Sequence, residues 1–413
     1  MNNPSKFYKA LSRHAFYYAQ VLEKADDLYR AGQEQVVQGL ALFELELANI
    51  KLGQTWAENQ AGIDKAAARL CIFYAYNGSA ILPLRFTPPE CLKWFIKAVE
   101  VARRSGNQPA ESVALGNLGN TYDSLGEYQQ AIDCLEQAVV LARQLGDRYG
   151  ENAWLGSLGS VYWNLNEYRR AIDYYEQALK VSRELGDQVN ESATLDNLGG
   201  AYKSLGEYQL AIDYHNKALV IARQIGDRYS EGAQLGHLGT AYKNRGEYQC
   251  AIDYYMQALA IAQAIGDQLS EGQHIGNLGL VYWNLSEYLR AIDYFEQALT
   301  IVCKVGNRPG EATWLNNLGN AYGSLGEYQR AIDYYEQALL IACAIGNRLS
   351  ESTHLHNLGR TYMRLGNTGK AIELLENSLH LSEEIESPYT EIIKQHLEEL
   401  GHQDRIANQN GVE

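Results

Sequence analysis

Hydrophobic and polar positions between residues 110 and 389 follow one pattern that recurs every forty residues. In the first copy Leu115, Leu118 and Tyr122 are spaced three and four residues apart, and a second apolar stripe runs from Tyr128 to Leu145. Both spacings place apolar side chains on one face of an α-helix. Each copy therefore predicts two amphipathic helices.

Seven such copies stand in register without an insertion. The Leu-Gly pair at 118/119 and the Ala-Ile pair at 131/132 recur at each step of forty residues. A fixed period of roughly 20 to 50 residues is typical of a solenoid, in which each unit buries its apolar face against its neighbours. We therefore expect an all-α right-handed solenoid.

Glycine both ends the predicted helices and interrupts the first helix of each copy. Gly146 follows an apolar stripe, where a left-handed residue commonly ends a helix, and Asp147 is a candidate N-cap for the next unit. Gly119 and its six equivalents lie inside a helix, where glycine costs about 1 kcal/mol relative to alanine. We expect close approach of the second helix to offset this cost, with the small Ala131 and Ala138 opposite.

The positions that carry the pattern resemble the tetratricopeptide repeat (TPR) consensus, although the leading large residue is Leu or Ile and the proline after the second helix is absent. They are Leu115, Leu118, Gly119, Tyr122, Gly126, Tyr128, Ala131, Leu135 and Ala138. The forty-residue period and the phrase LGNxYxxLGEYxxAIDYYEQALxIAxxIGD look like the TPR arrays of spindle-orientation adaptors and kinesin light chains. The resemblance implies a superhelical solenoid of antiparallel helix pairs whose first helices line a concave groove.

The chain on either side of the repeats predicts helical caps. The segment Thr87-Pro88-Pro89-Glu90 is a capping box with proline at the first helical position, and it opens a helix that stays in phase with the repeats. The predicted flanking helices are Lys6–Arg30, Glu34–Asn59, about Asp64–Leu82, Glu90–Gly106 and Pro388–Gly401. We expect a helical N-terminal cap with a degenerate repeat over 1–108 and seven TPR units over 109–389. A C-terminal capping helix with a frayed tail from Asp404 to Glu413 would complete the chain over 390–413.

One N-terminal phrase resembles a second group of proteins. The stretch GLALFELELANIKLGQTWAENQ looks like the helical segment that joins the ATPase module to the TPR sensor in bacterial STAND-type signalling proteins. The phosphate-binding motif GxxxxGK[ST] does not occur in the sequence. The resemblance therefore favours a sensor or coupling role rather than nucleotide hydrolysis.

Charge and composition exclude several classes of partner. The net charge is −15, with the acidic excess in the repeats, which argues against a nucleic-acid partner. The six cysteines show no metal-ligand or disulfide spacing, which is typical of a reducing cytoplasm. The start of the chain lacks the plan of a signal peptide, and the most apolar stretch, Cys71–Leu84, is too short to span a bilayer. We expect a cytoplasmic protein without a membrane partner.

Asparagines recur on the predicted first helices, on the stripe that points away from the apolar face. At one polar position the seven copies read Asn117, Ser157, Asn197, His237, Asn277, Asn317 and Asn357. A solvated face is usually built from Glu, Lys, Gln and Arg, whereas Asn and Ser disfavour helix. An amide both donates and accepts hydrogen bonds, so a row of them can pair with the backbone of an extended peptide. The resemblance implies such an asparagine ladder; the alternative is similarity inherited from recent duplication.

Two further residue types vary beside this stripe. Trp163 and Trp283 would be anchors if they faced the groove, and the alternative is that they pack on neighbouring second helices. Lys203 and Lys243 would give the middle of the groove positive charge. The candidate peptide-groove residues are Asn117, Asn120, Trp163, Asn164, Asn197, Lys203, Lys243, Asn244, Asn277, Trp283, Asn284, Asn317, Asn320 and Asn357.

These patterns predict a non-enzymatic scaffold that binds an extended peptide or partner segment in the concave groove. No nucleophile–base pair, metal-ligand spacing or phosphate loop stands out in the sequence, so we expect no catalytic residue, no metal and no cofactor. Two alternatives stay open: a sensor or regulatory subunit of a STAND-like system that couples through residues 1–105, and a self-associating structural solenoid. The identity of the partner and the oligomeric state are left open.

Overall fold

The computed structural model describes the backbone of residues 4–31 and 34–410 and the side chains of residues 6–31 and 35–401. Over these residues the chain forms twenty α-helices and no β-strand, as the hydrophobic pattern predicts. The chain divides into two compact units, Met1–Glu207 and Tyr208–Glu413. No helix within the described ranges combines the length and the apolar character needed to cross a membrane.

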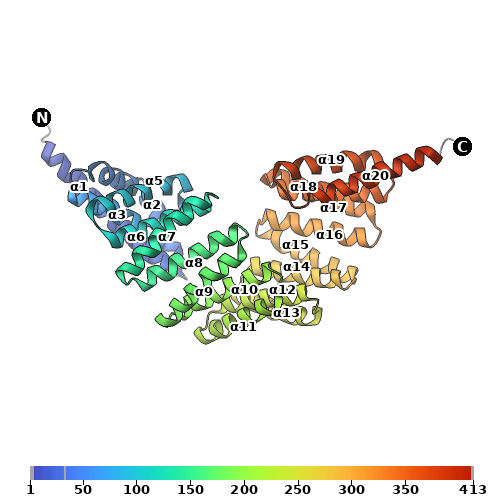
Figure 1. Cartoon of the computed structure of the whole chain (residues 1–413), viewed down its shortest axis with the longest axis horizontal. Helices are drawn as coiled ribbons and strands as arrows, with labels where there is room; N and C mark the ends of the chain where they lie inside the picture. The colour runs from blue at the N-terminus through green and yellow to red at the C-terminus, as the bar shows by residue number, and fades with distance from the viewer. Residues whose placement is uncertain (1–3, 32–33, 411–413) are drawn as a thin grey trace. The chain divides into compact units, whose positions relative to one another are not determined.

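The first unit begins with the hairpin of α1 and α2 and continues with helices that pack on it and then on one another (Figure 1). Its helices are α1 (Pro4–Arg30), α2 (Glu34–Gln60), α3 (Lys65–Asn77), α4 (Leu82–Arg85), α5 (Pro88–Ser105), α6 (Gln108–Ser124), α7 (Tyr128–Leu145), α8 (Arg148–Asn164), α9 (Tyr168–Leu185) and α10 (Gln188–Ser204). Here α6, α8 and α10 are the first helices of repeats, and α7 and α9 are second helices.

The second unit continues the alternation of first and second helices and ends with one long helix. Its helices are α11 (Tyr208–Ile225), α12 (Arg228–Arg245), α13 (Tyr248–Ile265), α14 (Gln268–Asn284), α15 (Tyr288–Lys304), α16 (Arg308–Ser324), α17 (Tyr328–Ile345), α18 (Arg348–Arg364), α19 (Thr368–Glu384) and α20 (Thr390–Asn410). The first helices are α12, α14, α16 and α18. Each packs on the second helix before it and on the one after it.

The turns between repeats follow the predicted end and start signals. Gly146 has φ +69°, and the Asp147 amide reaches back to the Ala142 carbonyl over 2.9 Å, which closes the end of α7. The Asp147 carboxylate then accepts a hydrogen bond of 2.9 Å from the Gly150 amide at the start of α8. Gly146 and Asp147 together therefore end one helix and begin the next. Because this link is so short, the forty-residue period stays constant.

The predicted third helix is shorter than expected. α3 ends at Asn77 and is followed by a turn and the short α4, whereas the sequence predicts one helix to Leu82. The carboxylate of Asp26, on α1, accepts hydrogen bonds of 3.0 Å from the amides of Ala80 and Ile81. These amides are therefore taken by a side chain of another helix instead of continuing α3. The predicted capping box of α5 is present.

The C-terminal helix is longer than expected. α20 starts at Thr390 and runs to Asn410, so the backbone is helical over much of the stretch that was expected to be frayed. Residues 411–413, the end of that predicted tail, lie outside the described residues. The division into 1–108, 109–389 and 390–413 stays a prediction.

In the six first helices for which the contact is described, the inner glycine lies close to the second helix, as expected, but its nearest neighbour is a large side chain. A Cβ at Gly119 would lie 2.6 Å from Leu135 Cγ and 3.1 Å from the carbonyl oxygen of Ala131. Ala138, the other small residue expected opposite this glycine, has a different contact. Its carbonyl oxygen accepts a hydrogen bond from the hydroxyl of Ser112, which lies nearer the start of α6. The missing side chain thus makes room for a large residue of the second helix, which in the next copy is Tyr175 against Gly159.

Most recurring tyrosines pack within a repeat. Tyr162 and Tyr174 stack with their ring centroids 5.2 Å apart, and the guanidinium of Arg170 lies 4.0 Å from the Tyr162 centroid. The same stacked pair occurs at 242/254, 282/294 and 322/334. These tyrosines therefore contribute to the packing of the two helices of a repeat.

Candidate functional site

The predicted asparagines of the first unit lie on the first helices but in unequal surroundings. Asn120 and Asn197 are exposed, and their side chains make no hydrogen bond within the described residues. Asn164 donates to the Asp123 carboxylate of the preceding first helix over 3.0 Å. Asn117 is half-buried, and its Nδ2 has no partner among the described residues.

The second unit shows the same division. Asn320 accepts a hydrogen bond of 2.7 Å from the Tyr335 hydroxyl, and Asn357 donates to Asn316 over 2.8 Å. Four other predicted asparagines are exposed or half-buried and make no side-chain hydrogen bond in the described part of the chain: Asn244, Asn277, Asn284 and Asn317. Six of the predicted asparagines in the two units therefore keep their hydrogen-bonding capacity, and three use it within their own unit. Their role in peptide binding stays a prediction.

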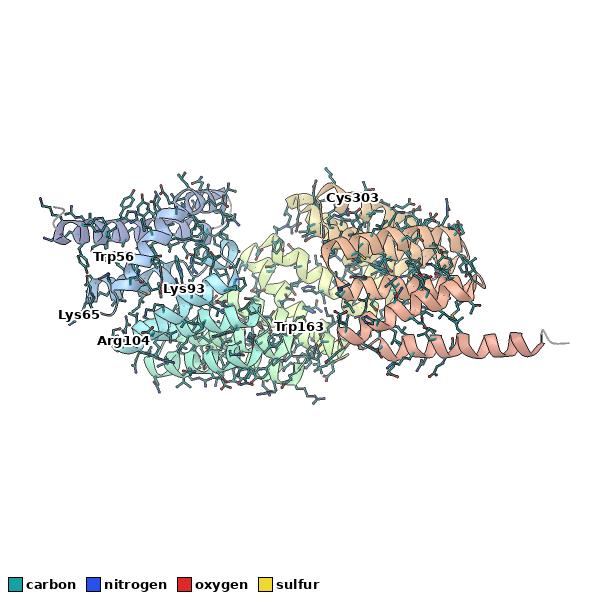
Figure 2. All side chains as sticks on the ribbon, turned by 90° about the horizontal axis from the view of Figure 1, so that it is seen from above. Trp56, Lys65, Lys93, Arg104, Trp163 and Cys303 are labelled. Carbon is teal, nitrogen blue, oxygen red and sulfur yellow. The ribbon has the colours of Figure 1, made fainter. Side chains whose placement is uncertain are left out.

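The predicted tryptophan anchors are partly exposed. Trp163 is 43% exposed, and its ring meets Tyr168 of α9 edge-on with the centroids 6.5 Å apart (Figure 2). Trp283 is 36% exposed and donates from Nε1 to the Ser324 hydroxyl of α16 over 3.3 Å. Each indole thus contacts its own unit and also offers surface to solvent. Lys203 and Lys243 are half-buried on α10 and α12.

Consecutive first helices meet where a large planar side chain lies over a small residue. A Cβ at Gly116 would lie 2.4 Å from Cη2 of Trp154, and one at Gly276 would lie 2.2 Å from Cη2 of Trp314. Both indoles are buried, so they fill the space between repeats. Gly236 is covered by His274 instead, whose Cε1 lies 2.6 Å from the place of a Cβ.

Burial changes the acid–base behaviour of the histidines at these contacts. Burial lowers the pKa of His274 to about 4 and that of His354 to about 4, because the charged imidazolium loses its hydration. His354 Nδ1 lies 3.1 Å from Asn316 Oδ1. These side chains are therefore neutral at pH 7.

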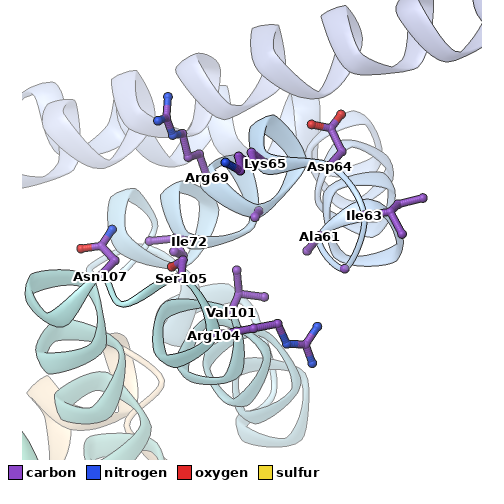
Figure 3. Close-up of a pocket in the computed structure, with 12 residues that line it drawn as sticks. Ala61, Ile63, Asp64, Lys65, Arg69, Ile72, Val101, Arg104, Ser105 and Asn107 are labelled. Atoms are coloured by element: carbon purple, nitrogen blue, oxygen red, sulfur yellow. The ribbon is translucent and has the colours of Figure 1, made fainter.

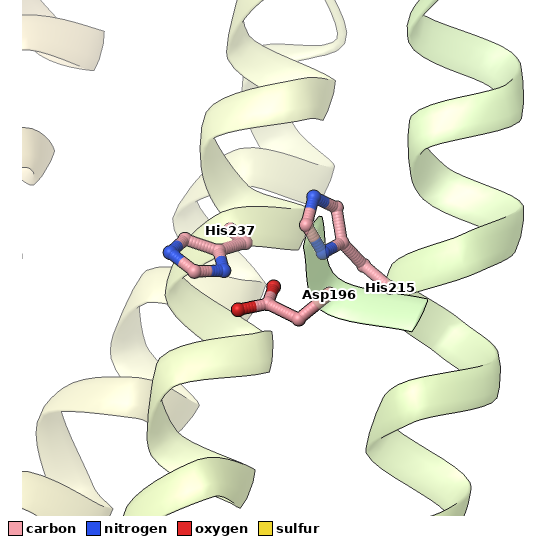
Figure 4. A group of neighbouring side chains, drawn as sticks. All are labelled: Asp196, His215 and His237. Carbon is pink, nitrogen blue, oxygen red and sulfur yellow. The ribbon is translucent and has the colours of Figure 1, made fainter. Parts of the chain in front are cut away.

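Two histidine pairs form between helices although the sequence shows no local histidine spacing. His356 Nε2 lies 2.9 Å from His396 Nδ1, and the pKa of His356 is lowered to about 4 by burial, with His396 adding to the shift. His215 of α11 and His237 of α12 have ring centroids 5.0 Å apart (Figure 4). The forty-residue separation of His356 and His396 is the sequence signal for the first pair.

Two cavities of the first unit carry opposite charge. The first, of about 680 Å³, is lined by Lys65 and Arg69 of α3 and by Arg104 of α5 (Figure 3). Arg104 is paired with Glu100 on its own helix. The second cavity, of about 630 Å³, is lined by α1, the end of α3 and the starts of α6 and α8, with four carboxylates and one guanidinium. We call this second cavity the acidic pocket, and the sequence did not predict it.

A family model described as tetratricopeptide repeat matches most of the chain in overlapping stretches. The matched residues are 87–144, 150–224, 190–264, 229–304, 270–344 and 310–384. The chain belongs to the tetratricopeptide repeat family. This TPR architecture is consistent with a protein–protein interaction scaffold.

Solved TPR structures share the fold. One is a Signal Transduction ATPase with Numerous Domains (STAND) protein with a tetratricopeptide repeat sensor from Pyrococcus horikoshii, with 18% identity over 90% of this chain and 55% of that chain and a TM-score of 0.58. The chain therefore spans about half the length of that protein. The apo form of the quorum sensor NprR from B. thuringiensis matches with 16% identity over 84% of this chain and 99% of that chain and a TM-score of 0.59.

A Rap protein complexed with Competence and Sporulation Factor is also similar, with 15% identity over 82% of this chain and 99% of that chain and a TM-score of 0.52. At these identities the likeness concerns the fold. No curated protein sequence matches the chain.

Proposed function

We propose that this TPR protein is a non-enzymatic scaffold that binds an extended segment of a partner protein along the first-helix faces of its repeats. The observation that carries the proposal is the set of six first-helix asparagines whose amides make no hydrogen bond within the described residues. Asparagine disfavours helix, so its recurrence at exposed helical positions favours a use outside folding. Each amide can pair with a peptide N–H and a peptide carbonyl.

Two further observations support a peptide or protein ligand. The structure of the Rap protein, which shares the fold, holds the Competence and Sporulation Factor. In this chain the exposed indole surfaces of Trp163 and Trp283 lie near the ends of α8 and α14, beside the asparagine positions. Large aromatic side chains are typical anchors of protein interfaces. We propose a cytoplasmic location because all six cysteines are free thiols.

The test is a selection of phage-displayed random decapeptides on the full chain, followed by affinity measurements. The Asn197→Ala/Asn277→Ala/Asn317→Ala variant should lose at least about tenfold in affinity for the selected peptides, because each of the three lost hydrogen bonds contributes roughly 0.5–1.5 kcal/mol. The matched control is Asn216→Ala/Asn377→Ala, which removes asparagines from the second helices α11 and α19. Failure to select any peptide, or equal affinity for all three proteins, would refute the ladder.

A second candidate function is favoured by the surface of the N-terminal hairpin. α1 and α2 expose large apolar side chains, among them Phe7, Phe16, Val37 and Leu45, which are all more than half exposed. Exposed apolar surface of this kind marks interaction sites. In a STAND-like sensor this hairpin would couple the repeats to a separate effector chain. The Phe16→Ser/Leu45→Ser variant should then lose effector binding and keep the selected peptides.

A further inference from the structure

The acidic pocket lies where the N-terminal hairpin faces the first helices of the first two repeats. α1 supplies Glu23 and Asp27 to its wall, and the end of α3 supplies Tyr76. The start of α8 adds Tyr149 and Trp154. All of these residues belong to the first unit, so one compact body forms the whole cavity of about 630 Å³.

The pocket has negative charge that the protein does not neutralise. The carboxylate of Asp26 is occupied, because it pairs with Arg30 at 2.6 Å and accepts two backbone amides. Among the described residues of the wall, Arg30 is the only cation, and its Nη2 also donates to the Ser79 hydroxyl over 2.9 Å. The carboxylates of Glu23 and Asp27 have no hydrogen bond or ion pair within the described ranges. Two carboxylates are therefore left for a cationic ligand.

Aromatic rings line the same cavity. Tyr76 is 53% exposed and Tyr149 is 63% exposed, so both rings are accessible. Trp154 is 8% exposed, and its Nε1 has no partner among the described residues. The face of an aromatic ring attracts an ammonium or guanidinium group, most strongly where water is partly excluded. Carboxylates together with aromatic faces select an organic cation over a metal ion, which would require several converging oxygen ligands.

Unpaired donors indicate what else the ligand carries. Three residues of the wall carry a buried N–H donor that has no hydrogen-bond partner in the described part of the chain. These donors are Asn77 Nδ2, Asn117 Nδ2 and Trp154 Nε1. An unpaired buried donor costs about 1–3 kcal/mol. A carbonyl oxygen next to the cation would satisfy such donors, and a peptide backbone supplies carbonyls at regular spacing. A free polyamine has none.

We propose that the acidic pocket binds an arginine or lysine side chain of the partner segment. The inference rests on the proposed function, because Asn117 of the predicted ladder lines the pocket, together with Val113 and Ala153 of the same stripe. The segment runs along α6 and α8, its cationic side chain enters between Glu23 and Asp27, and the tyrosine rings flank it. The pocket thus sets the register of the segment at the N-terminal end of the first-helix face.

The experiment repeats the decapeptide selection on the full chain and on two charge-matched variants. Glu23→Gln/Asp27→Asn removes the two unpaired carboxylates of the pocket with almost no change of shape. Asp133→Asn/Asp173→Asn removes two exposed carboxylates from the second helices α7 and α9 and controls for total charge. Circular dichroism and thermal unfolding show whether each variant keeps the fold.

Peptides selected on the unmodified chain should carry arginine or lysine at one fixed position. Their affinity should fall roughly tenfold in Glu23→Gln/Asp27→Asn and less than about twofold in the control variant. Replacing the selected arginine by citrulline should weaken binding to the unmodified chain but not further weaken binding to Glu23→Gln/Asp27→Asn. Such coupling places the cation at these carboxylates.

The outcomes separate this inference from the proposed function. The selected peptides can depend on Asn197, Asn277 and Asn317 and yet carry no fixed cation, or they can bind Glu23→Gln/Asp27→Asn equally well. Either result contradicts the proposed role of the acidic pocket and remains compatible with the proposed scaffold function. A fixed cation without coupling to Glu23 and Asp27 also overturns the proposed role of the pocket. Failure to select any peptide removes both proposals.

Discussion

The two units use the same helix pattern but different chemistry where consecutive first helices meet. In the first unit the indole of Trp154 covers Gly116, whereas in the second unit His274 covers Gly236 and His354 meets Asn316. Indole has no charge to gain, but imidazole can be protonated. The second unit also carries an indole, Trp314 over Gly276, and in the first unit a Cβ at Gly156 would meet no atom within 4 Å. The group at this position therefore varies between copies, and among the described contacts only those of the second unit contain imidazoles that can be protonated.

The links between a second helix and the next first helix also differ. Arg103, Arg143 and Arg183 of the first unit each form an ion pair with the glutamate eight residues later. In the second unit Arg223 keeps this pair, but the equivalent positions further on are Gln263, Cys303 and Cys343. The arginine–glutamate ion pair therefore ends within the second unit, where Gln263 donates to Glu271 over 3.0 Å and the two later positions are cysteines.

The largest expected effect is selective loss of stability in the second unit on acidification. His274 and His354 have a folded pKa of about 4 against 6.5 in the unfolded chain, so the unfolded state binds more protons between these values. Stability is full above about pH 6.5 and falls as the pH drops toward 4. Between pH 7 and pH 5 each histidine should lower the free energy of unfolding by about 2 kcal/mol. Hydrogen exchange followed by mass spectrometry, corrected for intrinsic exchange rates, measures the loss of stability separately for each unit.

The first unit should stay unchanged over the same interval. Its shifted carboxyls have lowered pKa values: Glu90, through hydrogen bonds from Lys51 and Thr87, to about 2, Asp64 through the Tyr8 hydroxyl, and Glu100 through Lys97. Their contribution is present above about pH 4.5 and is lost only as the pH falls below it. His274→Gln/His354→Gln, which copies Gln234 at the equivalent position, should remove the part of the acid sensitivity that these two histidines cause and leave the part caused by His356, whose pKa is also lowered to about 4. Equal acid sensitivity of both units would contradict the attribution of this sensitivity to the buried histidines of the second unit.

A smaller effect on stability is expected from glycine-to-alanine substitutions where consecutive first helices meet. Its sign depends on whether a ring of the next first helix covers the glycine. Gly116→Ala should destabilise the protein by about 1–3 kcal/mol, because the new methyl group overlaps the ring of Trp154. Gly156→Ala, one repeat later, meets no atom within 4 Å and should stabilise by up to about 1 kcal/mol through helix propensity. Gly276→Ala should resemble Gly116→Ala because Trp314 is equally close. Thermal unfolding checks all three, and shifts of the same sign would be inconsistent with the contact described.

The repeat pattern was sufficient to predict the helices, because each one follows from local periodicity and from glycine and Asp or Asn at its ends. The end of α3 was predicted wrongly, because the Asp26 carboxylate that takes the Ala80 and Ile81 amides comes from a helix more than fifty residues away. The acidic pocket was missed for the same reason. Glu23, Tyr76 and Tyr149 come from three segments that only the fold brings together.

The asparagine positions illustrate the limit of periodic reasoning. Asn120 and Asn320 occupy the same position of two repeats, but the Tyr335 hydroxyl donates to Asn320, whereas Asn120 makes no side-chain hydrogen bond within the described residues. Whether a ladder residue is available depends on its neighbours in the second helix, and these vary between copies. Tyr335 itself replaces the leucine found at Leu135.

The central claim is that a partner segment lies along the first helices, and the most direct test is to locate a bound peptide by photo-crosslinking. A selected decapeptide with diazirine-bearing residues at successive positions is irradiated with the full chain, and the crosslinked residues are identified by mass spectrometry. The account predicts crosslinks on α6, α8, α10, α12, α14 or α16, close to the asparagines. Crosslinks confined to the second helices α7, α9, α13, α15 or α17 would contradict it.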